Sequence, residues 1–389
     1  MKSIQESELV KHYMDQVLFK MVINFISRLS FFFLFCISLK STAQQPVTIF
    51  FDSLLQKHAS NGFSGVLLVA DKGIPVYNKA VGYREFAGKV ILQESDIFEM
   101  ASVSKQFTAM IIMMLKEKGK LKYDDLLEKY ITIPYKGITI RHLLTHTSGL
   151  PDYQAIMDKY WDKTKVAGNK DCIEYLNKYT PLVNFDPGNK YEYSNTGYLL
   201  LASIAERVTG KDFITLCRKW IFHPLKMKNT AIRTLQEKAV VKNFAIGHIY
   251  VKEKEQYIRA DSFPSSDYTI WLGNRKGPGR ISSTTGDLLK WDQALYTDRL
   301  IKQTTLQEAF TPVKLNDGSY TNYGFGWMLR SDSTAGKIVY HTGDNPGYRT
   351  IIIRYPDISK TIILFNNNVH ISFGAIIAAA EVYLKSLPQ

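Results

Sequence analysis

The chain has 389 residues, of which 45% are hydrophobic and 22% are charged, so it is long enough to bury one large core or two fused subdomains. Its formal net charge is +13, which would suit a nucleic acid or an anionic surface. The cations are scattered, however, and no basic helix or RNA-binding signature occurs. We therefore expect a solvated basic surface and no nucleic-acid partner.

The N-terminal region has the layout of a secretory signal peptide. Arg28 precedes an apolar run from Leu29 to Leu39, and small residues up to Ala43 then offer a cleavage site. The run is shorter than the ~20 apolar residues of a membrane-spanning helix, although an uncleaved anchor stays open as an alternative. We predict a signal peptide over residues 1–43, one domain over residues 44–389, and export to the periplasm. Two later methionines, Met14 and Met21, are alternative starting points.

Cysteine and histidine patterns give little sign of a disulfide framework or a metal site. After cleavage behind Ala43 only Cys172 and Cys217 remain, and the sequence leaves open whether they pair. No Cys-x-x-Cys and no His-Glu-x-x-His occurs, and the eight histidines are dispersed. We therefore expect neither a metal nor a cofactor.

The hydrophobic pattern of the first 120 residues predicts a helix, a hairpin and a buried helix. Residues 47–58 form the first helix, and Gly65–Val69 pairs with Pro75–Val81 in the hairpin. From Val103 to Lys118 the pattern is helical and almost wholly apolar, which is typical of a helix buried on all sides. Gly119 ends it.

Short helices and long loops fill the middle of the chain, and strands return near its end before a final apolar helix at roughly 371–386. Because strands stand at both ends of a helical middle, we predict an α+β fold in which the two ends meet in one antiparallel sheet flanked by helices. The middle would form a second, mostly helical region. The predicted helices are 139–145, 170–178, 197–208, 211–220 and 284–296, and the predicted strands are 323–330, 337–341, 348–355 and 360–366.

Ser102-Val103-Ser104-Lys105 is the only Ser-x-x-Lys in the chain and supplies a candidate nucleophile. On a helix this spacing puts Ser102 and Lys105 on one face, about one turn apart. A lysine that opens a buried helix must be paired, functional or deprotonated. An amine beside a hydroxyl can accept its proton, and the helix start adds a free backbone N–H and a favourable dipole. The tetrapeptide also occurs by chance, so the buried helix behind it is what favours this interpretation.

Tyr193-Ser194-Asn195 supplies a second group of candidates. It follows the Pro187-Gly188 turn and precedes an apolar helix, which places Tyr193 and Asn195 on a loop fixed by that helix. A tyrosine near a lysine can act as a phenolate base, because a nearby cation lowers its pKa. The alternative is a surface tyrosine followed by a helix-capping asparagine.

His341-Thr342-Gly343 follows directly on the predicted core of a strand, Lys337–Tyr340. A glycine in a strand permits close approach of a substrate's backbone. The alternative is a simple hairpin that carries no function.

Taken in order, the three motifs resemble those of the penicillin-recognising serine hydrolases, the β-lactamase / DD-peptidase family. Tyr-x-Asn is similar to the class C branch, which also holds DD-carboxypeptidases, esterases and D-amino-acid amidases. The resemblance runs from about residue 47 to 385. Three flanking segments agree with it: Leu143–Leu150, Gly279–Thr284 and Tyr323–Trp327.

The resemblance implies catalytic roles. Ser102 would attack a carbonyl and form an acyl-enzyme, while Lys105 and Tyr193 would move the proton on and off. Asn195 would hold the amide side chain of the substrate. The backbone N–H groups of Ser102 and Asp344 would form the oxyanion hole.

The third motif departs from the family's usual pattern. The resemblance places His341, Thr342 and Gly343 in the substrate-binding wall, with His341 where β-lactamases usually carry a lysine that meets the substrate's carboxylate. A histidine weakens carboxylate recognition at neutral pH, and it is more frequent in the peptidases and esterases of the family. Asp344 adds a negative charge at the oxyanion corner.

The resemblance therefore implies an exported serine hydrolase that needs no metal or cofactor and cleaves a D-Ala–D-Ala-type peptide or a small ester. A class C-like β-lactamase and a penicillin-binding cell-wall sensor without turnover are the alternatives on the same fold. A membrane-anchored structural protein rests only on the N-terminal apolar run. The expected partner is a peptidoglycan-like peptide, an ester or a β-lactam, and the oligomeric state stays open. Residues 150–170 and 250–278, which would shape the pocket, show no interpretable pattern.

Overall fold

The computed structural model describes residues 47–386, so the signal peptide predicted at residues 1–43 lies outside the described part. Residues 47–59 are helical, and the compact unit that contains every feature below begins at Leu54. Within residues 47–386, none of the helices is both long and apolar enough to cross a membrane. Over the same residues, no three His, Cys, Asp or Glu side chains gather as ligands of a metal ion would.

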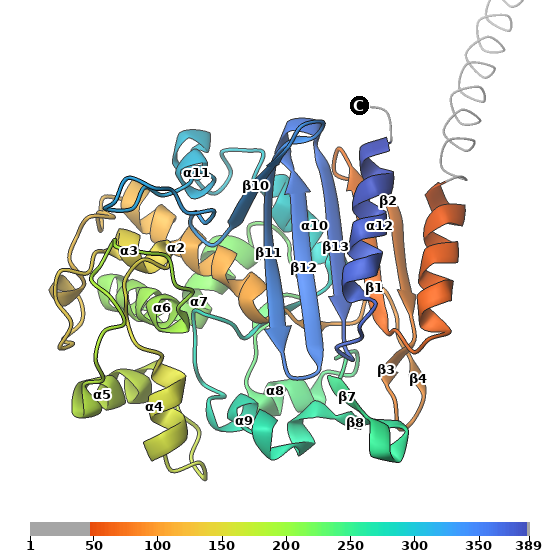
Figure 1. Cartoon of the computed structure of the whole chain (residues 1–389), viewed down its shortest axis with the longest axis horizontal. Coiled ribbons are helices and arrows are strands. Elements are labelled where there is room, and N and C mark those ends of the chain that lie inside the picture. The colour runs from red at the N-terminus through yellow and green to blue at the C-terminus, as the bar shows by residue number, and fades with distance from the viewer. Residues whose placement is uncertain (1–46, 387–389) are drawn as a thin grey trace, which may run out of the picture. The chain divides into compact units, whose positions relative to one another are not determined.

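A six-stranded antiparallel sheet is the centre of this unit (Figure 1). The strand order is β10-β11-β12-β13-β1-β2, so strands from opposite ends of the chain are neighbours. β1 (Gly65–Asp71) pairs with β13 (Lys360–Asn366) over its whole length. This confirms the predicted α+β fold with both ends in one sheet. The other strands are β2 (Ile74–Val81), β10 (Met328–Asp332), β11 (Gly336–Asn345) and β12 (Tyr348–Tyr355).

Helices cover both faces of the sheet. Every residue of β13 is buried, as expected of a strand that is covered on two sides. Figure 1 shows α12 (Phe373–Ser386) in front of the sheet and α10 (Thr285–Ala294) behind it, and both contact β13. The sheet is therefore the middle layer of a three-layer arrangement.

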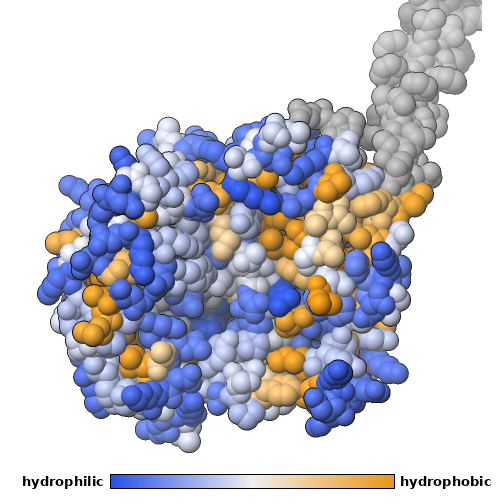
Figure 2. All heavy atoms as spheres, in the orientation of Figure 1, coloured by the Kyte–Doolittle hydropathy of each residue, from blue (hydrophilic) through white to orange (hydrophobic). Residues whose placement is uncertain are grey.

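The helical region beside the sheet is built around α2 (Lys105–Glu117), which continues the short helix η1 (Ala101–Ser104). All of α2 is buried as far as Leu115, as the apolar pattern predicts, and α6 (Asn195–Thr209) and α7 (Phe213–Cys217) pack against it. Figure 2 shows a mostly hydrophilic surface over this region. Its other elements include α3 (Ile140–Leu144), α4 (Tyr153–Tyr160), α5 (Asn169–Tyr179), η3 (Arg218–Phe222), α8 (Leu235–Val240), α9 (Tyr268–Trp271) and α11 (Gln303–Ala309).

Small ladders complete the unit and fill segments that the sequence left uninterpreted. β3 (Tyr83–Glu85) pairs with β4 (Val90–Ile91), and β7 (His248–Val251) pairs with β8 (Gln256–Arg259). A third ladder holds β9 (Ile281–Ser283) between two short strands, β5 (Phe98–Glu99) and β6 (Ala231–Ile232). The two cysteines, Cys172 and Cys217, are buried and free, so they do not pair.

The strand predicted at residues 323–330 is wrong in its first half. Gly326 adopts a φ of 78°, and the Gly324 N–H donates to the Trp327 carbonyl at 2.9 Å. The two glycines thus make a turn, and the strand begins only at Met328. The next strand is longer than predicted, because β11 continues to Asn345.

A buried ion pair joins the sheet to α10. Arg354 of β12 donates through Nε to Asp292, and both side chains are at most 1% exposed. The second oxygen of Asp292 accepts the Thr361 hydroxyl at 2.9 Å. A charge pair in such a dry place is strongly destabilising to break, because the remaining partner stays buried without compensation.

We expect Arg354→Met to lower the free energy of unfolding by about 3–5 kcal/mol, as measured by urea denaturation. The matched control is Arg259→Met, because the ion pair of Arg259 with Asp261 is about half exposed. Such a surface pair contributes under ~1 kcal/mol. Equal losses in the two variants would contradict this account.

Candidate active site

Ser102 lies on a bent segment that connects the sheet to the helical region. Its neighbour Met100 donates its N–H to the Ile281 carbonyl at 2.9 Å and accepts the Thr350 hydroxyl at 2.8 Å. Ala101 has a φ of 48°, which residues with a Cβ seldom adopt. The segment is therefore held in a strained conformation by strands β9 and β12, and Ser102 is left partly exposed at its surface.

β11 passes so close to this segment that only glycine fits at position 343. A Cβ on Gly343 would lie 2.2 Å from the Met100 carbonyl oxygen and 2.4 Å from the Thr350 hydroxyl oxygen. This glycine is thus required by the segment that carries Ser102. β10 pairs only with Gly336–Tyr340, so among the described strands the following residues of β11 have a partner on one side alone.

Lys105 places its amine between three oxygen atoms. Its Nζ lies 3.0 Å from Ser102 Oγ, 2.9 Å from Asn195 Oδ1 and 2.8 Å from the Pro278 carbonyl oxygen. Complete burial, and then the positive charge of Arg275, hold the pKa of Lys105 well below its usual value of 10.5. The amide and carbonyl oxygens only accept, so they take two N–H groups. In the neutral amine, the lone pair is then left for the Ser102 hydroxyl.

Tyr193 stands on the loop before α6 and covers this amine. The centre of its ring is 4.7 Å from Lys105 Nζ. Burial raises the pKa of Tyr193 above its ordinary value of 10, and the nearby Ser102 hydroxyl offsets only part of this shift. The shift is opposite to the lowering that a neighbouring cation would cause, because burial is the largest effect on this phenol. Tyr193 is therefore a protonated phenol at neutral pH.

A buried histidine without a predicted role supports the same loop. His146 accepts the Ser194 N–H through Nδ1 at 3.0 Å, and its ring centre is 4.3 Å from that of Tyr193. Burial, and then the charge of Lys105, hold the pKa of His146 well below 6.5. The sequence did hold a signal for His146, because this residue lies in Leu143–Leu150, a segment that resembles the family. The resemblance assigned no role to His146 itself.

His341 is buried beside the site, whereas the sequence analysis placed it in the substrate-binding wall, and its role in substrate binding stays a prediction. Its side chain is fully buried, with Nε2 2.9 Å from the Tyr323 hydroxyl and Nδ1 2.6 Å from the Thr342 carbonyl oxygen. A carbonyl only accepts, so Nδ1 carries the proton and Nε2 accepts from Tyr323. Burial, and then the charge of Lys105, lower the pKa of His341 to about 3. Both ring nitrogens are thus occupied by the protein and the ring is neutral.

The residues that alternate with His341 and Gly343 along β11 lie on the opposite face of the strand. Thr342 and Asp344 are exposed, as expected from the alternation of side chains along a strand. The carboxylate of Asp344 pairs with Arg349 at 3.3 Å. Ser102 and Asp344 line one cavity of about 80 Å³. Their N–H groups stay a predicted oxyanion hole at its wall.

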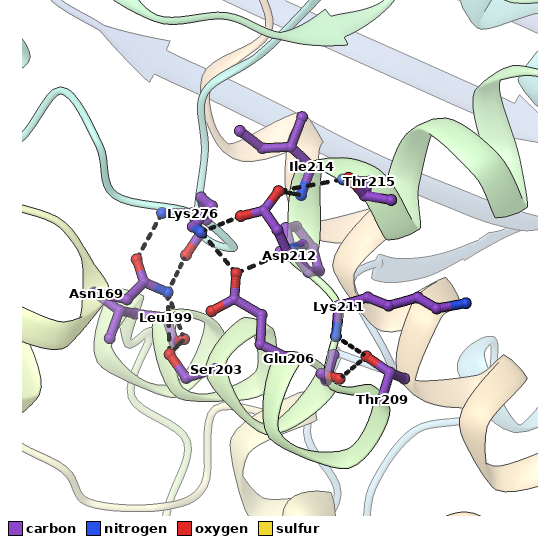
Figure 3. A network of polar contacts seen from close by, with 12 residues as sticks. Asn169, Leu199, Ser203, Glu206, Thr209, Lys211, Asp212, Ile214, Thr215 and Lys276 are labelled. Carbon is purple, nitrogen blue, oxygen red and sulfur yellow. Dashed lines mark hydrogen bonds and ion pairs between the residues drawn. The ribbon is translucent and has the colours of Figure 1, made fainter.

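The loop 274–280 lines this cavity. Side chains from α5, α6 and the start of α7 hold the loop in place by hydrogen bonds and ion pairs, which we call the clamp (Figure 3). The side-chain amide of Asn169 accepts the Lys276 N–H at 2.7 Å and donates to the Lys276 carbonyl at 3.1 Å. Lys276 Nζ contacts Glu206 at 2.6 Å and Asp212 at 2.7 Å. These contacts position the carbonyl that holds Lys105, and they lie in a segment to which the sequence analysis assigned no function.

Comparisons with known proteins identify the family and the fold. A family model described as Beta-lactamase matches residues 50–382. The chain is 38% identical over 355 residues to Penicillin-binding protein 4* of Bacillus subtilis (strain 168), which covers 90% of this chain and 78% of that protein. A penicillin-binding protein from Bacillus halodurans superposes with a TM-score of 0.71 and 26% identity, over 82% of this chain and 96% of that one. A D-amino acid amidase from Ochrobactrum anthropi SV3 shares the fold, with a TM-score of 0.67 and 24% identity over 86% and 99% of the two chains.

The neutral His341 predicts a loss of stability in acid. Its pKa is about 3 in the folded protein and near 6.5 when unfolded, so between these values the unfolded chain binds more protons. Stability therefore rises with pH through this window and falls by up to ~1.4 kcal/mol per pH unit as the pH drops below 6.5.

We expect His341→Gln, which does not titrate, to lose less stability than the wild type between about pH 7 and about pH 5 in urea denaturation. His223→Gln removes an exposed histidine and serves as the control. Wild-type acid sensitivity in the His341 variant would show that this residue does not cause it.

Proposed function

This chain belongs to the β-lactamase family of serine hydrolases, and we propose that it cleaves an amide or ester bond through an acyl-enzyme on Ser102. The observation that carries the proposal is the 3.0 Å contact between Lys105 Nζ and Ser102 Oγ. Two fixed acceptors, Asn195 Oδ1 and the Pro278 carbonyl, direct the remaining lone pair of the buried amine at the hydroxyl. A depressed lysine pKa beside a serine is a recognised way to activate the nucleophile.

Acylation follows from the two shifted pKa values. The neutral amine of Lys105 takes the proton of Ser102, whose Oγ forms a bond to the substrate carbonyl carbon. The oxyanion lies against the N–H groups of Ser102 and Asp344, a type of contact that contributes about 3–4 kcal/mol. When the bond to the leaving group breaks, the phenol of Tyr193 protonates that group and regains a proton from the Lys105 ammonium.

Deacylation reverses the same proton path. Water attacks the ester carbon, and its proton passes to the Lys105 amine. The bond to Ser102 Oγ then breaks, and Oγ regains a proton from the ammonium. Each group returns to its starting state, so the cycle consumes only water.

D-Ala–D-Ala-type peptides and small esters are the proposed substrates. The name of the Bacillus subtilis relative says that it binds penicillin, and a β-lactam presents the same kind of carbonyl to Ser102. A class C-like β-lactamase would release the acyl group rapidly, whereas a sensor would keep it, so a burst without turnover separates the sensor from both enzymes. The neutral, buried ring of His341 gives no cation to a substrate carboxylate, whether of a β-lactam or of a C-terminal D-alanine, which counts against efficient β-lactam hydrolysis and favours small esters.

Export to the periplasm is proposed with this function. Its support is the basic residue, the apolar run and the small residues found before Gln44 in the sequence. A peptidoglycan-like peptide would be met on that side of the membrane.

We expect Ser102→Ala to abolish turnover and covalent labelling by a fluorophosphonate or a fluorescent penicillin, because the attacking oxygen is removed. Ser104→Ala is the matched control. The hydroxyl of Ser104 is buried and accepts the Ile281 N–H at 3.2 Å, away from the cavity. Labelling should persist in this control. Undiminished labelling of the Ser102 variant would refute the assignment.

We expect Tyr193→Phe to slow acylation by about 10²–10⁴-fold, because the leaving group loses its proton donor. Stopped-flow release of 4-nitrophenol or 4-nitroaniline measures this rate, and the slowing should be greater for the anilide, whose leaving group needs the proton more. Tyr191→Phe, two residues earlier on the same loop, is the control. A fully active Tyr193 variant would remove this residue from the mechanism.

A further inference from the structure

Arg280 is a buried cation whose hydrogen-bonding groups are largely unused. It is 3% exposed and lines the cavity beside Ser102. Nη1 donates to the Thr269 carbonyl at 3.1 Å, whereas Nε and Nη2 have no hydrogen-bond partner. Burial lowers the pKa of Arg280 to about 10, so the side chain stays charged at neutral pH. Its φ of 80° adds backbone strain at the same residue.

Arg275 brings a second guanidinium to the same cavity. Its Nε and Nη1 are buried and have no hydrogen-bond partner. The guanidinium lies 5.4 Å from the centre of the Tyr268 ring, and the Tyr153 hydroxyl is within reach of it. Both tyrosines also line the cavity. The clamp on the loop 274–280 therefore holds two arginines beside the nucleophile.

The two carboxylates that line the cavity, Glu99 and Asp344, are each engaged by a cation. Glu99 forms an ion pair with Lys238 and a longer one, at 3.9 Å, with Arg280, and its second carboxylate oxygen is buried without a hydrogen-bond partner. Asp344 is 72% exposed and pairs with Arg349. After burial itself, the positive charges of the two arginines lower the pKa of Lys238, and that of Arg275 lowers the pKa of Lys105. The field in this part of the site is thus positive.

The arginines and Tyr193 lie near different parts of strand β11. The centre of the Tyr193 ring is 6.2 Å from that of the His341 ring. His341 is the first residue of β11 that pairs with β12 but not with β10. The cavity is lined by Asp344 and Asn345, at the end of the same strand. A strand rises ~3.3 Å per residue, so these places are roughly 10 Å apart. Because Tyr193 protonates the leaving group in the proposed mechanism, the acyl part of the substrate occupies the arginine side.

We propose that Arg280 and Arg275 bind a carboxylate carried by the acyl part of the substrate, so that the enzyme selects an acidic residue on that side of the scissile bond. Guanidinium groups suit this role, because they bind a carboxylate through paired N–H groups in fixed geometry. The cavity of about 80 Å³ suits a short acidic side chain. The inference rests on the proposed function, since Ser102 and Tyr193 define the two sides.

Two substrates that differ by one charge test the proposal. They are the α-(4-nitroanilide)s of N-acetyl-D-glutamic acid and N-acetyl-D-glutamine, and the absorbance of released 4-nitroaniline gives kcat/KM. We expect the wild type to prefer the glutamic substrate by about 10–100-fold, the usual range for a hydrogen-bonded charge. Arg280→Met and Arg275→Met should each reduce this preference at least severalfold, and Arg280→Lys should retain part of it. The exposed Arg218→Met is the control for a simple loss of charge.

The ratio of the two kcat/KM values cancels any difference in the fraction of active enzyme, so partial misfolding of a variant does not disturb it. No wild-type preference for the glutamic substrate, or a preference that survives in both methionine variants, would overturn the proposal.

A wild type that cleaves neither anilide would count against the proposed amide hydrolysis. In that case, binding measured by calorimetry tests the proposed carboxylate site separately. In the Ser102→Ala protein, the α-amide of N-acetyl-D-glutamate should bind more tightly than that of N-acetyl-D-glutamine. Adding Arg280→Met should remove this difference in affinity. Equal binding of the two amides to the Ser102→Ala protein that keeps Arg280 would overturn the proposal.

Discussion

The proposed chemistry depends on one buried amine held between two acceptors and a hydroxyl. Lys105 has no exposed surface, so its charged form loses hydration, and nothing in its shell is a carboxylate that would restore it. Asn195 and the Pro278 carbonyl occupy its N–H groups without adding charge. A lysine on the surface, with the same serine beside it, would stay an ammonium at neutral pH and could not take a proton.

Distant segments must meet to build that environment. The short helix η1 carries Ser102, the start of α2 carries Lys105, and the start of α6 carries Asn195. The loop 274–280 supplies the carbonyl. β11 then closes the site from the sheet side through the contact at Gly343. Each contact crosses from one layer or region to another, so the site exists only in the assembled fold.

Neutral aromatic groups and charged groups are separated within the site. The rings of His146 and His341 are buried and uncharged at neutral pH, and Tyr193 beside them is a neutral phenol, so none of these side chains adds charge around the amine. The two arginines line the cavity beside Ser102 and suit an anionic acyl group, and the charge of Arg275 also reaches the amine. Arg275 would thereby serve both the base and the choice of substrate.

The sequence by itself determined the class of fold, the buried helix and the motif residues, because hydrophobic period and local spacing are properties of contiguous residues. It could not tell that Gly326 turns the chain away from the predicted strand, or that the ring of His341 is hydrogen-bonded to Tyr323. It also gave no role to Arg280, although an arginine between glycine and an apolar strand was visible in Gly279–Thr284. The direction of a side chain, and the pKa that follows from its burial, are set by residues far away in the chain, so only the tertiary structure decided them.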